Sequence, residues 1–488
     1  MNMRCVSHNQ RHSLILRSHP FPSSVQDNPH LRRAPLPAEW EHFLHAASRV
    51  KSLKHCVLED DISDEIFDAV AIYRPKLLLL PNIERLEWLD ETADTDISLH
   101  ASMFLGPRLR SLTLTKAQSP SHLGAPDFPN IVALLKTVHY MECRLDTLQV
   151  EIGEVASKDV GAATTALVLA NDLKEFLCQE IPLPNDAVVR LARLPSLRNA
   201  GISLQPGTTI EELDGPLFPV VKHLDISLDN LAERACRKLI SNIASTCLET
   251  LSVTFRQEPS HDVLSSFIRQ LASSQNALEL RTFHLLQDSA RYKELEGQLP
   301  GRPDLVIHCL TLLPMFNMRN LVDIEIRSPH VDLDDTALIL IIKAFPGLRR
   351  LCCIPNYYCG RAPKATLNSI VTAARCLPHL QELGFPVDVS TQTVQTIDQF
   401  SPANWTCSRL HVADSPLSQE QMGHVAQFLH IWFRHVKLRI IASDPDVPGD
   451  LAHAEEREVY AIQWEECNRL MHPWEWWTDE MTARLEES

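Results

Sequence analysis

A short apolar pattern that returns along most of the chain is the feature that most limits how it can fold. In LRSLTL, residues 109–114, apolar side chains stand at offsets zero, three and five, which suits a short buried strand entered through a turn. Further copies are VKSLKH (50–55), IERLEW (83–88), LDTLQV (145–150), LKEFLC (173–178), LRNAGI (197–202), VKHLDI (221–226), LETLSV (248–253), LRTFHL (280–285), LVDIEI (321–326), LRRLCC (348–353), LQELGF (380–385), HVKLRI (435–440) and, in degenerate form, SRLHVA (408–413). The middle apolar residue of each copy serves as a marker, from Leu53 to Leu438, and the average spacing of about 30 residues is close to that of leucine-rich repeats.

The segments between the markers have the spacing of helices that are apolar on one side. The expected helices cover residues 229–246, 260–274, 332–347 and 363–376. Asp229 and Ser260 are expected N-caps of the first two, because their side-chain oxygens can accept hydrogen bonds from free backbone amides. Pro346 should end the third helix, and Pro363 should stand in the first turn of the fourth.

Strand and helix therefore alternate, and no single copy can form a core of its own. Burying a large apolar side chain contributes roughly 1.5–3 kcal/mol, which one repeat cannot accumulate against the entropy of ordering its backbone. Stacked copies can do so. We predict an α/β fold, an irregular leucine-rich-repeat solenoid (horseshoe) with a parallel inner sheet and outer helices.

The chain divides into three expected parts. Residues 1–35, rich in Arg, Ser and Pro, should be a disordered leader or a truncated linker, with a mitochondrial transit peptide as the alternative. Residues 36–445 hold the repeats, and residues 446–488 should form a helical C-terminal cap. This last part contains three closely spaced tryptophans, Trp474, Trp476 and Trp477. We expect them to help close the last repeat; the alternative is an exposed aromatic site for a partner.

Bulk properties exclude several classes of function. The formal net charge is −16, and no basic run is present that could follow a nucleic-acid backbone. No apolar run approaches the roughly 18 residues that span a bilayer. The 13 cysteines show no C-x-x-C spacing, and no secretory signal precedes them. We expect a cytoplasmic or nuclear protein with reduced thiols that binds neither nucleic acid nor membranes.

Residues 305–385 carry motifs more specific than the period. A Leu-Asp-Asp helix start at 333–335 precedes a Phe-Pro-Gly-Leu strand entry at 345–348. A Pro-Lys-Ala-Thr-Leu helix start at 363–367 then precedes a Pro-His-Leu-Gln-Glu-Leu strand at 378–383. This order resembles that of the F-box/leucine-rich-repeat proteins common in mushroom-forming fungi.

Two tryptophans extend the resemblance over roughly residues 36–488. Trp40 is similar to the residue that follows the F-box in such proteins, and Trp464 is similar to one in their closing helix. The resemblance implies substrate recognition for a cullin-RING ubiquitin ligase, with the F-box bound to a Skp-family adaptor. No F-box is recognisable in the proline-rich residues before Trp40. A Skp-family adaptor is therefore an expected partner only if an F-box lies upstream.

The sequence offers no motif for catalysis. Phosphate-binding loops, dinucleotide fingerprints, zinc-protease helices and nucleophile elbows are all missing, and glycine, with 14 residues, is scarce. Three histidines suggest a metal site at first, namely His424, His430 and His435. They span too many turns to share one helix face, and no cysteine or carboxylate joins them at ligand spacing. We expect no enzyme activity, no cofactor, no metal and no catalytic residue.

Two further clusters have structural explanations. Asp332, Asp334 and Asp335 stand at an expected helix start, where acidic residues are favoured by capping and by the helix dipole. Cys352 and Cys353 are adjacent in an expected strand, so alternation should place one in the core and one on the open face.

A partner is expected on the concave face of the sheet, where the residues between the markers point. The expected partner-binding residues are Arg85, Glu87, Thr113, Gln149, Glu175, Asp225, Asp323, Glu325, Arg350, Glu382 and Arg409. Acids outnumber arginines in this set, which indicates a protein partner with a basic patch. Reversing Asp323 and Glu325 to lysine should then remove partner binding without unfolding the chain.

Two functions are consistent with these features. The first is a non-enzymatic protein-interaction scaffold that resembles the substrate-recognition part of an F-box ubiquitin-ligase receptor. The alternative is an adaptor-independent acidic repeat scaffold, or an inhibitor, that binds a basic protein partner.

Overall fold

The computed structural model describes residues 4–8, 11–15, 36–56, 64–90, 98–116, 129–152, 158–205, 208, 215–231, 234–257, 259–288, 306–328, 330–355, 362–390, 406–413, 415–433, 438–442 and 454–471. The chain forms two compact units, residues 1–227 and 228–488. Each is described separately.

In the first unit, strands and helices alternate along the chain. The strands are β1 (Arg4–His8), β2 (Arg11–Ile15), β3 (Ser52–Cys56), β4 (Arg85–Asp90), β5 (Ser111–Lys116), β6 (Thr147–Glu151), β7 (Glu175–Leu183), β8 (Asn199–Leu204) and β9 (His223–Leu228). The helices are α1 (Pro37–Ala47), α2 (Asp64–Tyr73), α3 (Ser98–Ala101), α4 (Pro129–Tyr140), α5 (Lys158–Ala170) and α6 (Asn185–Ala192), with a 3-10 turn at Ser102–Phe104. From β2 to β9 each strand pairs in parallel with the next one in the sequence.

The second unit repeats this plan. Its strands are β10 (Thr250–Phe255), β11 (Thr282–Gln287), β13 (Asp323–Ser328), β15 (Arg350–Pro355), β16 (Glu382–Gly384), β17 (Arg409–His411) and β18 (Arg439–Ile441), which pair in parallel in that order. Its helices are α7 (Arg234–Ser241), α8 (His261–Ala272), α9 (Cys309–Leu312), α10 (Asp335–Ala344), α11 (Leu367–Cys376), α12 (Gln419–Phe433) and α13 (Ala454–Met471), with 3-10 turns at Gln275–Leu278 and Leu313–Asn317. Two short strands, β12 (Val306–Ile307) and β14 (His330–Val331), form a separate parallel pair.

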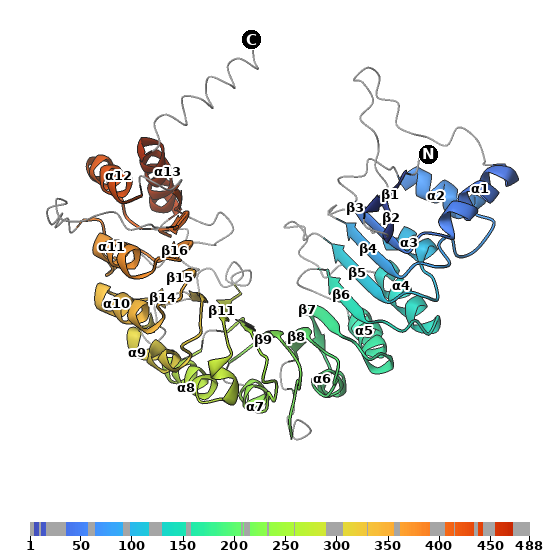
Figure 1. Cartoon of the computed structure of the whole chain (residues 1–488), viewed down its shortest axis with the longest axis horizontal. Helices are drawn as coiled ribbons and strands as arrows, with labels where there is room; N and C mark the ends of the chain where they lie inside the picture. Colours follow the sequence, from blue (N-terminus) through green and yellow to red (C-terminus); the bar gives the residue numbers. More distant parts are fainter. Residues whose placement is uncertain are drawn as a thin grey trace, which may run out of the picture. The chain divides into compact units, whose positions relative to one another are not determined.

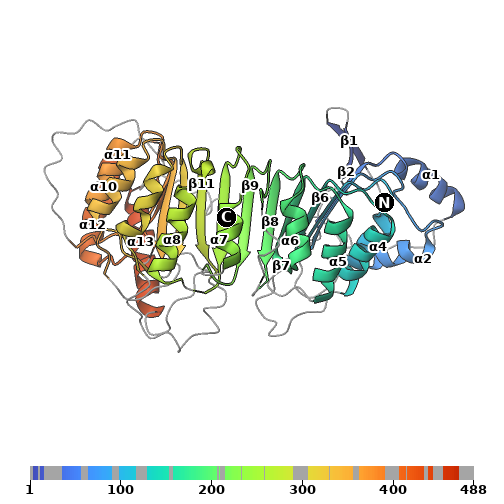
Figure 2. The same ribbon diagram turned by 90° about the horizontal axis from the view of Figure 1, so that it is seen from below.

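Helices cover one face of the sheet in each unit. In the first unit α4, α5 and α6 lie along the same side of the strands, and in the second unit α8, α10 and α11 do so (Figure 1). Figure 2, turned by 90°, shows the strands of each unit side by side behind these helices. The predicted α/β architecture with a parallel sheet and solenoid-like repetition is therefore confirmed in each unit.

The marker residues stand at equivalent positions in their strands. In the first unit Leu53, Leu86, Leu112, Leu148, Phe176, Ala200 and Leu224 are register partners from strand to strand. In the second unit Leu251, Phe283, Ile324, Leu351, Leu383 and Leu410 are so. All of them are buried. One marker is wrong: Ile440 rather than Leu438 pairs with Leu410, because β18 begins only after Leu438.

A backbone link joins each repeat to the next at the start of its strand. The carbonyl of Glu84 accepts from the amides of Arg110 and Ser111 at 2.8 and 3.0 Å. The carbonyl of Val322 accepts from those of Arg349 and Arg350 at 2.7 and 3.1 Å. The same two-amide link recurs at Lys51, Arg110, Asp146, Lys174 and Arg198 in the first unit and at Glu249, Arg281, Arg349 and Gln381 in the second. It joins consecutive strands through backbone atoms alone, without any side chain.

Two helix starts differ from those expected. Ser260 caps α8 as predicted, its hydroxyl accepting from the amide of Val263 at 3.4 Å. Asp229 does not cap α7, which begins at Arg234; its carboxylate lies 3.4 Å from Arg256 instead. The helix α11 begins at Leu367, so Pro363 lies before it and not in its first turn. Thr366 is its N-cap, and the hydroxyl accepts from the amide of Asn368 at 3.2 Å.

Regular structure is present near both ends of the chain. Two strands, β1 and β2, form within residues 1–35, which were expected to be a disordered leader or a truncated linker, and β2 pairs with β3. An otherwise open strand edge is favourable for such an addition. At the other end, α13 is helical as expected of a cap, and Trp464 is buried with its Nε1 donating to the carbonyl of Ser415 at 2.9 Å. Trp474, Trp476 and Trp477 lie outside the described residues.

Candidate functional site: the polar face of the sheet

The face of each sheet that carries no helices is formed by the residues directly before and after each marker, and we call it the polar face. Side chains alternate along a strand, so these residues point away from the buried markers. The expected partner-binding residues all occupy such positions: Arg85, Glu87, Thr113, Gln149, Glu175, Asp225, Asp323, Glu325, Arg350, Glu382 and Arg409. They form one surface in each unit.

In the first unit the polar face carries charged side chains beside uncharged ones. Glu87, Thr113 and Gln149 are register partners on β4, β5 and β6. Glu87 lies 3.9 Å from Lys54, with both side chains largely exposed, so this pair contributes little to stability. Glu175 accepts from Asn199 at 3.0 Å, so its carboxylate is engaged with a neighbouring strand.

In the second unit charged residues alternate in sign across four strands. Asp323, Arg350, Glu382 and Arg409 are register partners on β13, β15, β16 and β17. Arg350 lies 3.8 Å from Asp323 and donates from Nε to Oε1 of Glu382 at 3.1 Å. Arg409 lies 3.5 Å from Oε2 of Glu382 and is the most exposed of the four, with 61% of its side chain accessible. We call these four residues the charge ladder.

Glu325 lies beneath the charge ladder and not on its surface. Only 7% of its side chain is exposed, and its oxygens contact Arg327 at 2.6 Å and Arg350 at 2.8 Å. Asp323 is also engaged, since Nε2 of His284 lies 3.2 Å from its Oδ1. Lysine at position 325 would bury a cation beside two guanidinium groups, so the expectation that reversal leaves the fold intact does not suit this environment. The acids of this unit are paired within the chain, and the surface that they form carries both signs.

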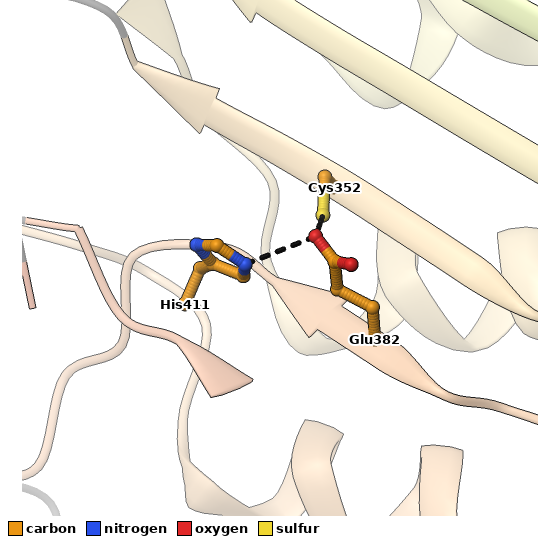
Figure 3. Close-up of side chains that lie close together, drawn as sticks. All are labelled: Cys352, Glu382 and His411. Carbon is orange, nitrogen blue, oxygen red and sulfur yellow. Dashed lines mark hydrogen bonds and ion pairs between the residues drawn. The ribbon is translucent and has the colours of Figure 1, made fainter. Parts of the chain in front are cut away.

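The structure brings together three side chains that the sequence analysis did not combine. Cys352, Glu382 and His411 come from three consecutive strands, and one donor atom of each lies within 4.8 Å of the other two. Cys352 Sγ lies 3.5 Å from Oε1 of Glu382, and His411 Nε2 lies 3.0 Å from the same oxygen (Figure 3). Nε2 of His411 is buried but makes no aligned hydrogen bond within the described part of the chain.

The environment keeps Glu382 charged and Cys352 protonated. The contact with His411, helped by the charge of Arg350, lowers the pKa of Glu382 to about 2 despite its partial burial. Burial, together with the charge of Glu382, raises the pKa of the Cys352 thiol well above its usual range. Burial likewise raises the pKa of Cys353 to about 12. The two thiols lie on opposite faces of β15, as alternation predicts, but both are buried, so neither is a reactive surface thiol.

The acidic cluster at 332–335 has structural roles. Asp334 caps α10, accepting from the amide of Ala337 at 2.7 Å. Asp335 joins two repeats, because its carboxylate accepts from the amide and hydroxyl of Thr366, both at 2.7 Å, and from the hydroxyl of Ser369 at 2.5 Å. Capping, as expected, explains this cluster in part, and a link between neighbouring helices explains the rest.

Of the three histidines first considered for a metal site, His424 and His430 lie on α12, and His435 lies outside the described residues. Nδ1 of His430 lies 3.0 Å from the carbonyl oxygen of Met471, at the end of α13. This contact joins the two helices. No helix in the described ranges combines the length and the apolar character needed to cross a membrane.

No protein-family model matches the chain, and no curated protein matches it. A function must therefore be inferred from the repeated fold and from the side chains of its polar face.

Proposed function

We propose that the chain is a leucine-rich-repeat scaffold that binds a protein partner through its polar face, without catalysing a reaction. The observation that carries this proposal is the construction of that face from equivalent positions of consecutive repeats. Each strand supplies side chains to one continuous polar surface in its unit, while apolar residues and helices form the other side. Repeat proteins use such extended surfaces for binding.

The charge ladder supports a partner that presents both positive and negative groups. Arg350 is held between carboxylates of neighbouring strands, and its position is therefore fixed before a partner arrives. Fixing side chains in advance lowers the entropic cost of binding. Exposed Arg409 at one end of the charge ladder is next to Arg439 on β18, which gives that end a positive character. The partner with a basic patch that the sequence led us to expect stays a prediction, and the exposed arginines add an acidic patch to it.

Charge reversal at the exposed end of the charge ladder tests the proposal. The tagged chain is expressed in cells that naturally produce it, and bound proteins are quantified for wild type, for Arg409→Glu/Arg439→Glu and for a control, Lys343→Glu/Arg269→Glu, on the outer helices. Both variants change the charge equally. A partner that uses the polar face should be reduced at least tenfold in the first variant only. Equal recovery in the two variants would contradict the proposed binding face.

The same experiment separates two forms of the scaffold. Recovery of a Skp-family adaptor and a cullin with the partner supports the substrate-recognition part of an F-box ligase receptor. Recovery of a partner without them supports the adaptor-independent scaffold or inhibitor, for which the net charge of −16 suits a partner with exposed basic groups.

A further inference from the structure

We propose that Cys352, Glu382 and His411 form a binding site for a zinc ion on the polar face. Thiolate, imidazole and carboxylate are the three side-chain groups that bind Zn²⁺ in proteins, and three protein ligands leave a fourth position for water or another donor. Here the three groups come from β15, β16 and β17, whose parallel pairing fixes their backbones relative to one another. The site shares Glu382 with the charge ladder, but a zinc ion there does not depend on the proposed partner binding.

Two of the three donor separations are close to those around a tetrahedral zinc ion, and all three donor atoms lie within 4.8 Å of one another. Zinc bonds of about 2.3 Å to sulfur and about 2.0–2.1 Å to nitrogen and oxygen place neighbouring donors roughly 3.3–3.6 Å apart. The Sγ of Cys352 already lies 3.5 Å from Oε1 of Glu382. The Nε2 of His411 lies 3.0 Å from that oxygen, so this pair needs to separate only slightly. Figure 3 shows the carboxylate of Glu382 between the other two side chains.

A glycine provides the space in which these groups meet. Gly384 is the register partner of both Cys352 and His411, and it stands between them on β16. A Cβ at this position would lie 3.1 Å from Sγ of Cys352, 3.1 Å from Cβ of His411 and 2.9 Å from Cδ1 of Ile354. The missing side chain therefore lets the thiol and the imidazole approach one another across the intervening strand.

The three donors differ in how ready they are to bind a metal. Oε1 of Glu382 lies between the other two donors, and Nε2 of His411 makes no aligned hydrogen bond to another described group. The thiol of Cys352 must lose its proton, which passes to solvent as the sulfur–zinc bond forms. Arg350 contacts the same carboxylate but also holds Glu325 at 2.8 Å. It therefore keeps a partner if zinc takes Oε1 of Glu382.

The two adjacent buried thiols of β15 provide the first test, because Cys352 is a proposed ligand and Cys353 is not. The full chain is treated with a chelator and titrated with Co²⁺, which replaces Zn²⁺ and reports tetrahedral thiolate coordination through its absorption bands; Zn²⁺ is then added in competition. In wild type and in Cys353→Ala, these bands should grow until one Co²⁺ is bound per chain. Cys352→Ala should lose the thiolate band and bind Zn²⁺ at least tenfold more weakly. Identical spectra for the two variants, or no bands in wild type, would overturn the site.

A second pair of variants keeps all three donor residues. Gly384→Ala puts a methyl group into the space between the ligands, whereas Gly423→Ala, on α12, has no atom within 4 Å of its added Cβ. Circular dichroism first establishes that both are folded. The first variant should bind Zn²⁺ at least tenfold more weakly, and the second should match wild type. Should Gly384→Ala not fold, His411→Gln takes its place with the same expected loss, and unchanged affinity in the folded variant argues against the site.

Discussion

Removing Arg350 should destabilise the second unit far more than removing Arg409, although both belong to the charge ladder. Arg350 has 26% of its side chain exposed and contacts Asp323, Glu325 and Glu382. Its replacement by methionine keeps an unbranched side chain but leaves these carboxylates with fewer cationic partners. The expected loss of stability therefore comes from the electrostatic contacts of Arg350 and not from its volume.

The expected magnitude follows from the burial of each group. Removing one partner of a buried ion pair costs roughly 3–5 kcal/mol, but Arg350 is partly exposed and Glu325 keeps Arg327 at 2.6 Å. We expect a loss of about 2–3 kcal/mol for Arg350→Met. Arg409 is 61% exposed and, within the described part of the chain, its ion pair is the one to Glu382 at 3.5 Å, so Arg409→Met should cost about 0–1 kcal/mol.

Hydrogen exchange measures this difference locally, which suits a repeat protein whose unfolding need not be two-state. Amides of β13 and β15 should exchange about 30-fold to 140-fold faster in Arg350→Met, since each 1.4 kcal/mol is about a factor of ten. In Arg409→Met the change should stay within about fivefold. Equal protection of the two variants would refute the reasoning, because burial would then not decide the strength of these ion pairs.

Three other perturbations have clear expectations. Asp335→Ala should cost about 2 kcal/mol in a urea-unfolding measurement, against about 1 kcal/mol for Asp334→Ala, because the first breaks a link between repeats and the second only a cap; equal losses would contradict the link. Trp464→Ala should cost roughly 3–5 kcal/mol and expose α13 to limited proteolysis, since the indole is buried; unchanged cleavage would argue against this packing. Burial raises the pKa of Cys178, which lowers its thiolate fraction, and also blocks access to it. Iodoacetamide at mildly alkaline pH should therefore label exposed Cys376 before Cys178, as mass spectrometry would detect; earlier labelling of Cys178 would contradict its burial.

The repeat architecture was predictable because it depends on a spacing that survives substitution. Ala200 and Phe176 are register partners although one is small and the other aromatic. The spacing failed at Leu438, where two apolar residues two positions apart satisfy the same pattern and only the start of β18 separates them. Asp229 was misplaced for a different reason: its carboxylate meets Arg256 from the next repeat, and a cap pattern does not include such distant competitors.

The sequence predicted which residues lie on the polar face, but it did not predict how deeply each side chain is buried there. Alternation places Glu325 on the polar face, but it cannot show that arginines from two strands cover it. The proposed zinc ligands were predictable from the sequence in part. Cys352 and His411 each directly follow a marker, and so does Gly384 on the strand between them. The spacing does not predict that Glu382 contacts Cys352 and His411, which are not its register partners. These contacts depend on the rotamer that the neighbours of Glu382 allow.

The two-amide link between repeats has a consequence for how such a chain can change over time. The link uses only backbone atoms at the start of each strand, such as the carbonyl of Val322, and so it does not depend on which side chains follow. The segment between one strand and the start of the next strand can therefore become longer at a small entropic cost. Spacings between markers that vary from 24 to 41 residues fit this freedom. Insertions can accumulate at one edge of the sheet while the polar side chains keep their alignment, so binding specificity and chain length can evolve separately.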